Sequence, residues 1–128
     1  MKVLALDYGA ARTGVAVSDP TGTIARPVGV VEKAASEAGL ERVRELAIEH
    51  EVDRVVVGLP LTLRGMRGEQ ALATESFVET LRAALDIPVV TYDERFTTAL
   101  ASSTGGSAGE DARAAAHLLE SYLGSVGR

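Results

Sequence analysis

Residues 2–19 of the chain have the sequence KVLALDYGAARTGVAVSD, which joins a buried strand pattern to an acidic residue. The short apolar run of residues 3–6 is typical of a strand covered on both faces, and it leads directly into Asp7. A turn of small residues follows, in which Gly9 can adopt positive φ and allow backbone or ligand to approach closely. Residues 13–18 then predict a second strand, so the stretch predicts a β-hairpin. On this stretch alone, Asp7 either caps the turn or helps to hold a divalent metal or a phosphate.

The length and composition are those of one globular domain that spans residues 1–128. Hydrophobic residues make up 46% of the chain and charged residues 24%, and no apolar run is long enough to span a bilayer, so we expect no membrane association. The N-terminal residues MKVLALD lack the features of a signal peptide, so we expect a cytoplasmic protein. The absence of cysteine excludes disulfides and thiolate metal sites, which leaves carboxylates as the main candidate ligands.

The net charge of −5 argues mildly against a nucleic-acid binder with a broad basic face. Much of this charge lies in residues 32–51, where six glutamates stand against three basic residues. Four of the glutamates recur every four residues and are predicted to line one solvated helix face. Four arginines lie in or beside the glycine-rich and acidic motifs: Arg12, Arg64, Arg67 and Arg95. The sequence is therefore compatible with an acidic protein that has a locally basic cleft.

The order of predicted elements indicates an α/β fold. Asp19 is expected to set a turn before a third strand over residues 23–31, in which Pro27 indicates a sheet edge or a bulge. The remaining predicted elements are a helix over 36–51, a strand over 52–58, a helix over 69–85, a strand over 87–92, a helical turn over 97–101 and a helix that opens with a capping box at Ser107. This order predicts a mixed five-stranded sheet, with strands 1–3 antiparallel, strands 4 and 5 parallel, and helices packed on it.

Three acidic residues occupy positions where burial would favour an apolar side chain. Asp7 and Glu94 end predicted core strands, and Asp111 projects from the apolar face of the last helix. Burying an ionised carboxylate is costly unless it is paired or coordinates a cation. Arginines could compensate these acids in a salt-bridge cluster, whereas one or two Mg²⁺ or Mn²⁺ ions would compensate them and create a phosphodiester-cleaving site.

Four segments of the chain also carry a family resemblance. ALDYGAARTGVAVSD, VVVGLPLTLRGMRGEQA, TYDERFTT and EDARAAAHLLESYL resemble, in order and spacing, the motifs of the YqgF family, also called RuvX. These are small bacterial proteins with a ribonuclease H-like fold, linked to Holliday junction resolution and to maturation of the 5′ end of pre-16S rRNA. The resemblance implies a metal-dependent endonuclease that acts on a four-way DNA junction or on pre-16S rRNA. Its catalytic, metal-binding triad would be Asp7, Glu94 and Asp111.

The resemblance also suggests roles for individual residues. Asp7 would bridge two metal ions, and Glu94 and Asp111 would each help to fix one. Asp93 is a reserve ligand, but neighbours on a strand point to opposite faces, so either Asp93 or Glu94 should face away. His50 and His117 lie in no motif and are expected to be structural or exposed.

The expected substrate contacts are a glycine and four arginines. Gly9 would let the substrate backbone approach, while Arg12 and Arg95 would hold the scissile or an adjacent phosphate. Arg64 and Arg67, in the glycine-containing loop, would clamp flanking phosphates. The alternative is that Arg95 pairs with Asp93, and that Arg64 and Arg67 only keep their loop soluble.

Two other classes of protein are alternatives. A phosphotransferase or ATPase of the actin and sugar-kinase type also begins with a hairpin and an acid, but this chain is too short for a two-lobed clamp and lacks a Walker loop. A non-catalytic factor in ribosome maturation or transcription would bind nucleic acid without cutting it. Junction resolution makes a further demand, because two symmetric cuts require a twofold homodimer or two sequential events.

Overall fold

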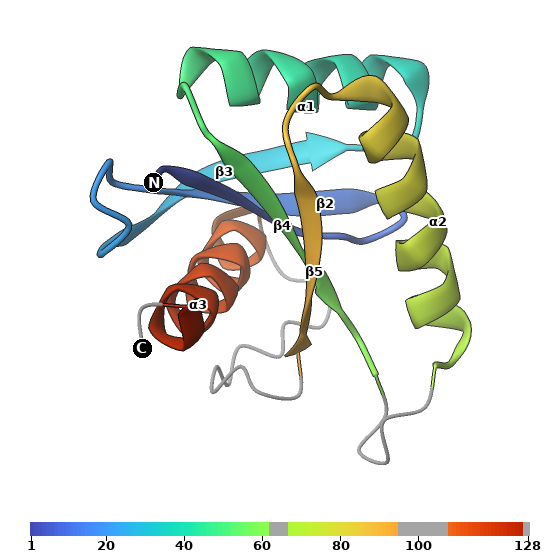
Figure 1. The fold of residues 1–128 in the computed structure, drawn as a ribbon. Coiled ribbons are helices and arrows are strands. Elements are labelled where there is room, and N and C mark those ends of the chain that lie inside the picture. The colour runs from blue at the N-terminus through green and yellow to red at the C-terminus, as the bar shows by residue number, and fades with distance from the viewer. Residues whose placement is uncertain (62–66, 95–107, 127–128) are drawn as a thin grey trace.

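A mixed five-stranded sheet forms the centre of the protein, as a computed structural model shows for residues 1–61, 67–94 and 108–126 (Figure 1). The strands are β1 (Val3–Asp7), β2 (Arg12–Ser18), β3 (Ala25–Glu32), β4 (Arg54–Leu59) and β5 (Val89–Asp93). The helices are α1 (Glu37–Glu49), α2 (Glu69–Ala84) and α3 (Ala108–Val126). The strand order is β3-β2-β1-β4-β5, so β1 lies at the centre. The first three strands pair antiparallel and β4 pairs parallel with both β1 and β5, which confirms the predicted sheet.

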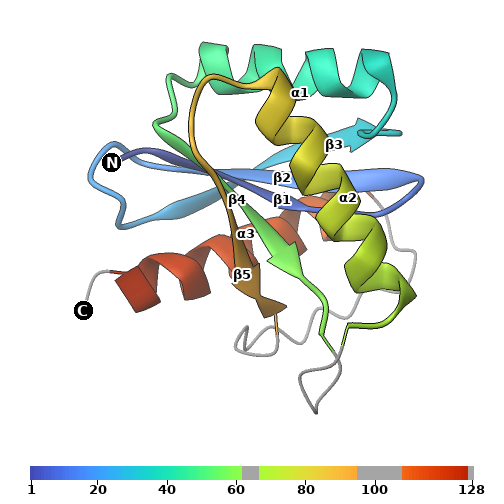
Figure 2. The same cartoon turned by 45° about the vertical axis from the view of Figure 1, so that its right-hand side comes forward.

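The two faces of the sheet are covered by different helices. Helices α1 and α2 lie on one face and α3 lies on the other, as Figures 1 and 2 show from two directions. Leu4 and Leu6 of β1 pack in the core under α1 and α2, whereas Val3 and Ala5 pack in the core under α3. Because side chains alternate along a strand, Asp7 continues the series of Val3 and Ala5 and lies on the α3 face.

The hairpin between β2 and β3 follows the predicted pattern. Strand β3 lies at the sheet edge, and its register with β2 shifts between Val15 and Ala16, next to Pro27, so the expected edge and bulge are both present. The turn before β3 is organised by Asp19, whose Oδ1 accepts hydrogen bonds from the backbone N–H of Thr23 (2.7 Å) and Ile24 (2.9 Å). These hydrogen bonds hold the pKa of the Asp19 carboxyl well below its usual range.

The helices also match the predictions closely. Ser36 caps α1 by accepting a hydrogen bond from the N–H of Gly39, and the acidic face of α1 is exposed and paired with Arg42 and Arg44. Phe77 and Leu81 are among the buried residues of α2, as expected. The predicted capping box at Ser107 and the helical turn over 97–101 lie outside the described residues. In the part of the chain that the structure describes, no helix is long and apolar enough to cross a membrane.

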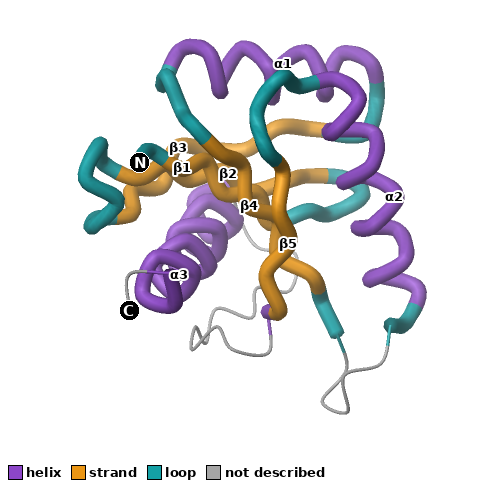
Figure 3. Tube along the Cα trace, viewed as in Figure 1, coloured by secondary structure: helices purple, strands orange, loops and turns teal. Residues whose placement is uncertain are grey.

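The parallel pairing brings one end of three strands together. Strand β4 runs in the same direction as β1 and β5, so the C-terminal ends of all three lie at one edge of the sheet. Figure 3 shows the ends of β4 and β5 at this edge, where the chain enters the loops that follow each strand. Residues at these strand ends are therefore neighbours in space although they are far apart in the sequence.

Candidate active site

The structure brings the three predicted acids together at this edge. Asp7 is the last residue of β1, Glu94 follows β5 directly, and Asp111 lies in the first turn of α3. Asp7 and Glu94 share a side-chain hydrogen bond, and the charge of Asp111 also acts on Asp7. Three segments of the chain thus deliver one carboxylate each to the α3 face of the sheet.

Two glycines make room for this cluster. Gly14 of β2 pairs with Asp7, and Gly58 of β4 follows Val57, the partner of Leu6, so the two glycines flank Asp7 on either side. A Cβ atom on Gly14 would overlap the backbone carbonyl of Asp111, and one on Gly58 would lie 2.8 Å from both Cγ and Cδ of Glu94. This role was not predicted from the sequence. Its only signal is a glycine inside each of two predicted strands, which often marks a close approach of another group.

Burial and mutual repulsion perturb two of the acids. Burial raises the pKa of Asp7, and the negative charge of Asp111 adds to this, although the hydrogen bond with Glu94 opposes it. Burial also raises the pKa of Glu94 to about 7, with further contributions from the charge of Asp7, its hydrogen bond and the charge of Asp93. Two carboxylates this close cannot both ionise at low cost, so in the metal-free protein the pair holds a proton near neutral pH.

The raised pKa of Glu94 predicts a pH-dependent effect of Glu94→Gln. Its folded-state pKa of about 7 exceeds the ordinary value of 4.5, so the cost of ionising Glu94 is absent below pH 4.5 and complete above pH 7. At 1.36 kcal/mol per pKa unit, this cost is at most about 3 kcal/mol. We therefore expect Glu94→Gln to raise the Tm of the chelator-treated protein at pH 8 and to change it little at pH 4.5.

The matched control for this measurement is Asp86→Asn, which neutralises an exposed carboxylate at the opposite end of the sheet. It should give the same small change in Tm at both pH values. An equal stabilisation by Glu94→Gln at pH 4.5 and pH 8 would show that ionisation of Glu94 does not destabilise the folded protein.

Asp111 has a different partner from the other two acids. Its Oδ2 lies 2.9 Å from Nε of Arg12, at the start of β2, and the Asp111 side chain is only 18% exposed. The contact is an ion pair without hydrogen-bond geometry, because this buried Oδ2 has no hydrogen-bond donor within the described residues. The arginine compensation that the sequence left open is thus present for one of the three acids.

Two contacts hold the turn between β1 and β2 in place. Tyr8 stacks on Phe77 of α2 with ring centroids 4.3 Å apart, and the Gly9 N–H lies 3.4 Å from Oγ1 of Thr13. Gly9 does not use the positive φ that is open to glycine, because its φ is negative or extended. The position needs glycine for another reason: a Cβ there would lie 2.5 Å from the carbonyl oxygen of Arg12, so the turn could not close.

The other predicted residues lie in varied settings. Arg67 Nη1 lies 3.2 Å from each carboxylate oxygen of Glu75 on α2, in an exposed ion pair. Arg64 and Arg95 lie outside the described residues. His50 caps the C-terminus of α1, and His117 is exposed on α3 beside Glu120, so neither joins the acids.

The donor atoms at this site suit a hard divalent cation. All three side chains offer carboxylate oxygens, the donors that Mg²⁺ and Mn²⁺ prefer. Two features of the structure fit such an ion: the close approach of the Asp7 and Glu94 carboxyl groups, and the buried Asp111 Oδ2, which has no hydrogen-bond donor among the described residues. As the side chains now stand, no three His, Cys, Asp or Glu residues in the described ranges form a finished metal site.

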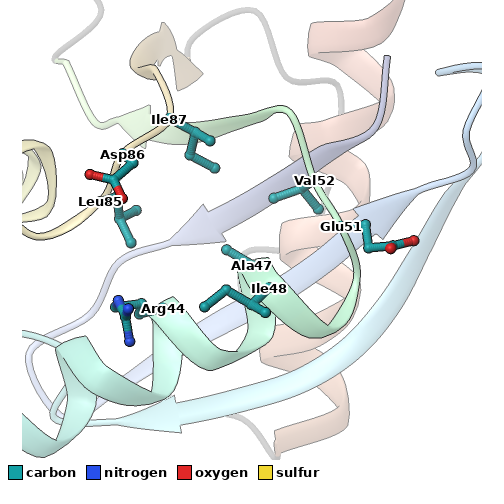
Figure 4. Close-up of a pocket in the computed structure, with 8 residues that line it drawn as sticks. All are labelled: Arg44, Ala47, Ile48, Glu51, Val52, Leu85, Asp86 and Ile87. Atoms are coloured by element: carbon teal, nitrogen blue, oxygen red, sulfur yellow. The ribbon is translucent and has the colours of Figure 1, made fainter.

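A cavity of about 220 Å³ lies elsewhere in the fold (Figure 4). Its lining comes from the end of α1 and from the segments before β4 and before β5: Arg44, Ala47, Ile48, Glu51, Val52, Leu85, Asp86 and Ile87. These segments meet at the N-terminal ends of β4 and β5, whereas the acids lie at the C-terminal ends. The cavity is therefore separate from the acidic site.

Comparisons with known proteins agree with this geometry. The sequence model of a family described as "RuvX: Holliday junction resolvase" matches residues 1–125. A protein of Desulforudis audaxviator named "Putative pre-16S rRNA nuclease" is 40% identical, over 98% of this chain and 95% of its own length. A protein of the same name from Listeria monocytogenes is 37% identical, over 96% of this chain and 97% of its own length.

The fold also matches that of a solved structure. RuvC of Thermus thermophilus, solved in complex with a Holliday junction substrate, superposes with a TM-score of 0.64 over 99% of this chain and 96% of its own, at 19% identity. This likeness confirms the predicted ribonuclease H-like fold. The family match and the relatives confirm the predicted class of enzyme, a nuclease that hydrolyses phosphodiester bonds of nucleic acid. Matched along almost its whole length, the chain belongs to the RuvX (YqgF) family.

Proposed function

We propose that this chain is a cytoplasmic endonuclease that cleaves structured nucleic acid with Mg²⁺ or Mn²⁺ at Asp7, Glu94 and Asp111. The observation that carries the proposal is the convergence of these acids, from three distant segments, on one face of the sheet. A fold has no structural need to bury a carboxylate pair that must share a proton. Perturbed pKa values of this kind are common at functional sites.

The position of each acid suggests its role. Asp7 interacts with both other acids, through a hydrogen bond with Glu94 and through the charge of Asp111, so it would be the central ligand of the bound metal. Glu94 and Asp111 would each help to hold one ion. Divalent ions at such a site lower the pKa of the attacking water and stabilise the leaving oxygen. The protein's own part is to hold the three carboxyl groups close together and to place the phosphate beside them.

The substrate contacts would come from the hairpin and from the loop between β4 and α2. Arg12 lies beside Asp111, so it can contact a phosphate held at the acids. Gly9, Arg64 and Arg95 are proposed as further contacts from the sequence pattern. Arg67 would leave Glu75 and pair with a flanking phosphate. This change of partner costs little, because an exposed ion pair of this kind contributes at most about 1 kcal/mol to stability.

A side-by-side cleavage assay tests the proposal. The purified protein is given an immobile four-way DNA junction and a pre-16S rRNA leader, in Mg²⁺ and then in Mn²⁺, with Asp7→Asn as the control. Symmetric cutting of the junction alone would identify a resolvase, and its mass on the junction should then be that of a dimer, because two cuts require two sites. Cutting of the leader alone would identify an rRNA-processing nuclease. Cutting by Asp7→Asn at the unchanged rate would contradict the proposed site.

One observation favours a second candidate, a nucleic-acid-binding factor that does not cut. Arg12 already compensates Asp111, and the acids do not form a finished metal site as they stand in the described residues. Metal-dependent stabilisation separates the two candidates, because a ligand that binds only the folded state raises Tm. A nuclease should show a rise in Tm with Mn²⁺ that Asp7→Asn removes, whereas a pure binding factor should show none.

A further inference from the structure

The ion pair between Arg12 and Asp111 suggests a function beyond charge compensation. The carboxylate is the less exposed partner, at 18%, while the Arg12 side chain is 34% exposed. The guanidinium can therefore leave the pair towards solvent, whereas the carboxylate stays in the site. Loss of the pair would leave Asp111 Oδ2 buried with no hydrogen-bond donor in the described part of the chain, a state that a cation would relieve.

The backbones on both sides of this pair are fixed. The carbonyl of Asp111 packs directly against Gly14, where even a methyl group would overlap it. On the other side, β2 pairs Arg12 with Glu32 of β3, and the N–H of Lys33 donates to the carbonyl of Ala11 at 3.0 Å. A change of partner at Asp111 is thus confined to side-chain rotation and needs no movement of the fold.

We propose that Arg12 is an exchangeable counter-ion: it neutralises Asp111 in the metal-free enzyme, yields this carboxylate to the incoming divalent cation, and then pairs with the substrate phosphate. This inference rests on the proposed metal-dependent nuclease function. It assigns the guanidinium at Asp111 as the compensating charge that the metal replaces. Arg12 is then a positioning residue that couples metal binding to phosphate binding.

The exchange predicts opposite effects on two ligands. A positive charge beside Asp111 must be displaced before the carboxylate can bind a cation, so removing it should strengthen binding of the metal alone. The same removal should weaken binding of nucleic acid, because the released guanidinium is no longer there to meet the phosphate. A merely structural ion pair predicts another pattern, in which loss of Arg12 lets Asp111 relax and weakens binding of both ligands.

Calorimetric titration of Mn²⁺ into protein without nucleic acid tests the first effect. Arg12→Gln is expected to bind Mn²⁺ about tenfold more tightly than the unchanged protein, a coupling within the usual range between linked sites. Arg12→Lys keeps the charge and should bind Mn²⁺ much as the unchanged protein does. Arg113→Gln is the matched control, since it removes an exposed arginine two residues beyond Asp111 on α3 and should change the affinity little.

The second readout is nucleic-acid binding and the steady-state kinetics of whichever substrate is cut. With Mn²⁺ saturating, Arg12→Gln should raise the KM, and Arg12→Lys should restore it in part. If the unchanged protein binds Mn²⁺ and cuts, but Arg12→Gln binds Mn²⁺ equally or more weakly, the exchange is wrong and the nuclease proposal stands. If neither protein binds Mn²⁺, both proposals are wrong. Should Arg12→Gln fail to fold, a much weaker Mn²⁺ affinity in Arg12→Lys would contradict the exchange instead.

Discussion

Asp7→Asn is expected to lower the cleavage rate by more than about 100-fold, because loss of a residue that merely supports a metal ligand already costs 10- to 100-fold. Asp7 is the central acid, since it contacts Glu94 through a hydrogen bond and feels the charge of Asp111. An amide at this position keeps the shape of the side chain but removes the charge that would bridge two ions. The measurement is the single-turnover rate on the better substrate, with Mg²⁺ and with Mn²⁺.

The same substitution should leave the fold intact and even stabilise it. Burial raises the pKa of Asp7, so its ionised form destabilises the metal-free protein at alkaline pH, and the neutral amide removes that cost. We expect a higher Tm than the unchanged protein at pH 8 in chelator, together with loss of the Tm rise on adding Mn²⁺. Asp86→Asn, an exposed acid at the opposite end of the sheet, is the matched control and should change neither cleavage nor the response to metal.

Much of the fold was predictable because its signals are local. The apolar run before Asp7 and the β-branched run of residues 52–58 define strands, and the helical periodicity places Phe77 and Leu81 inward. Pro27 indicated an edge or a bulge because proline has no backbone N–H to donate to a neighbouring strand, and both features are present. The order of strands and helices then allows few possible sheet topologies, since the crossover connections between parallel strands are right-handed.

The acids were predictable for a related reason, but their surroundings were not. An acid at the end of a buried strand is a local anomaly, so Asp7 and Glu94 could be selected from the sequence. The roles of Gly14 and Gly58 depend on register and on where α3 and Glu94 come to lie, and these are long-range facts. The partner of Arg12 depends likewise on the packing of α3 across β2. The need for glycine at position 9 has a local origin instead, because the turn requires its small size and does not use a positive φ.

Gly58→Ala, at one of the two glycines beside Asp7, is expected to lower the cleavage rate strongly while changing the stability little. A Cβ on Gly58 would lie 2.8 Å from Cγ and Cδ of Glu94, which belong to a side chain that can rotate away. Alanine also suits a strand better than glycine, so the free energy of unfolding should fall by no more than about 1 kcal/mol. Displacing Glu94 by about 1 Å should nevertheless lower the cleavage rate by about 100-fold.

Gly14→Ala is the matched variant, because it adds the same methyl group on the other side of Asp7 but against backbone. The carbonyl carbon of Asp111 would lie 2.6 Å from the new Cβ, and only a shift of α3 could relieve that contact. We expect a loss of about 3 kcal/mol or more in the free energy of unfolding, at the upper end of overpacking substitutions.

Urea unfolding and cleavage rates of the two variants provide the test. If Gly58→Ala were as unstable as Gly14→Ala, Glu94 would be rigidly held rather than free to rotate; if Gly58→Ala cut at the unchanged rate, the position of Glu94 would not matter for catalysis. A site whose geometry depends on these two glycines predicts one combination of results. Gly58→Ala should fold stably but lose cleavage, and Gly14→Ala should be destabilised as a whole.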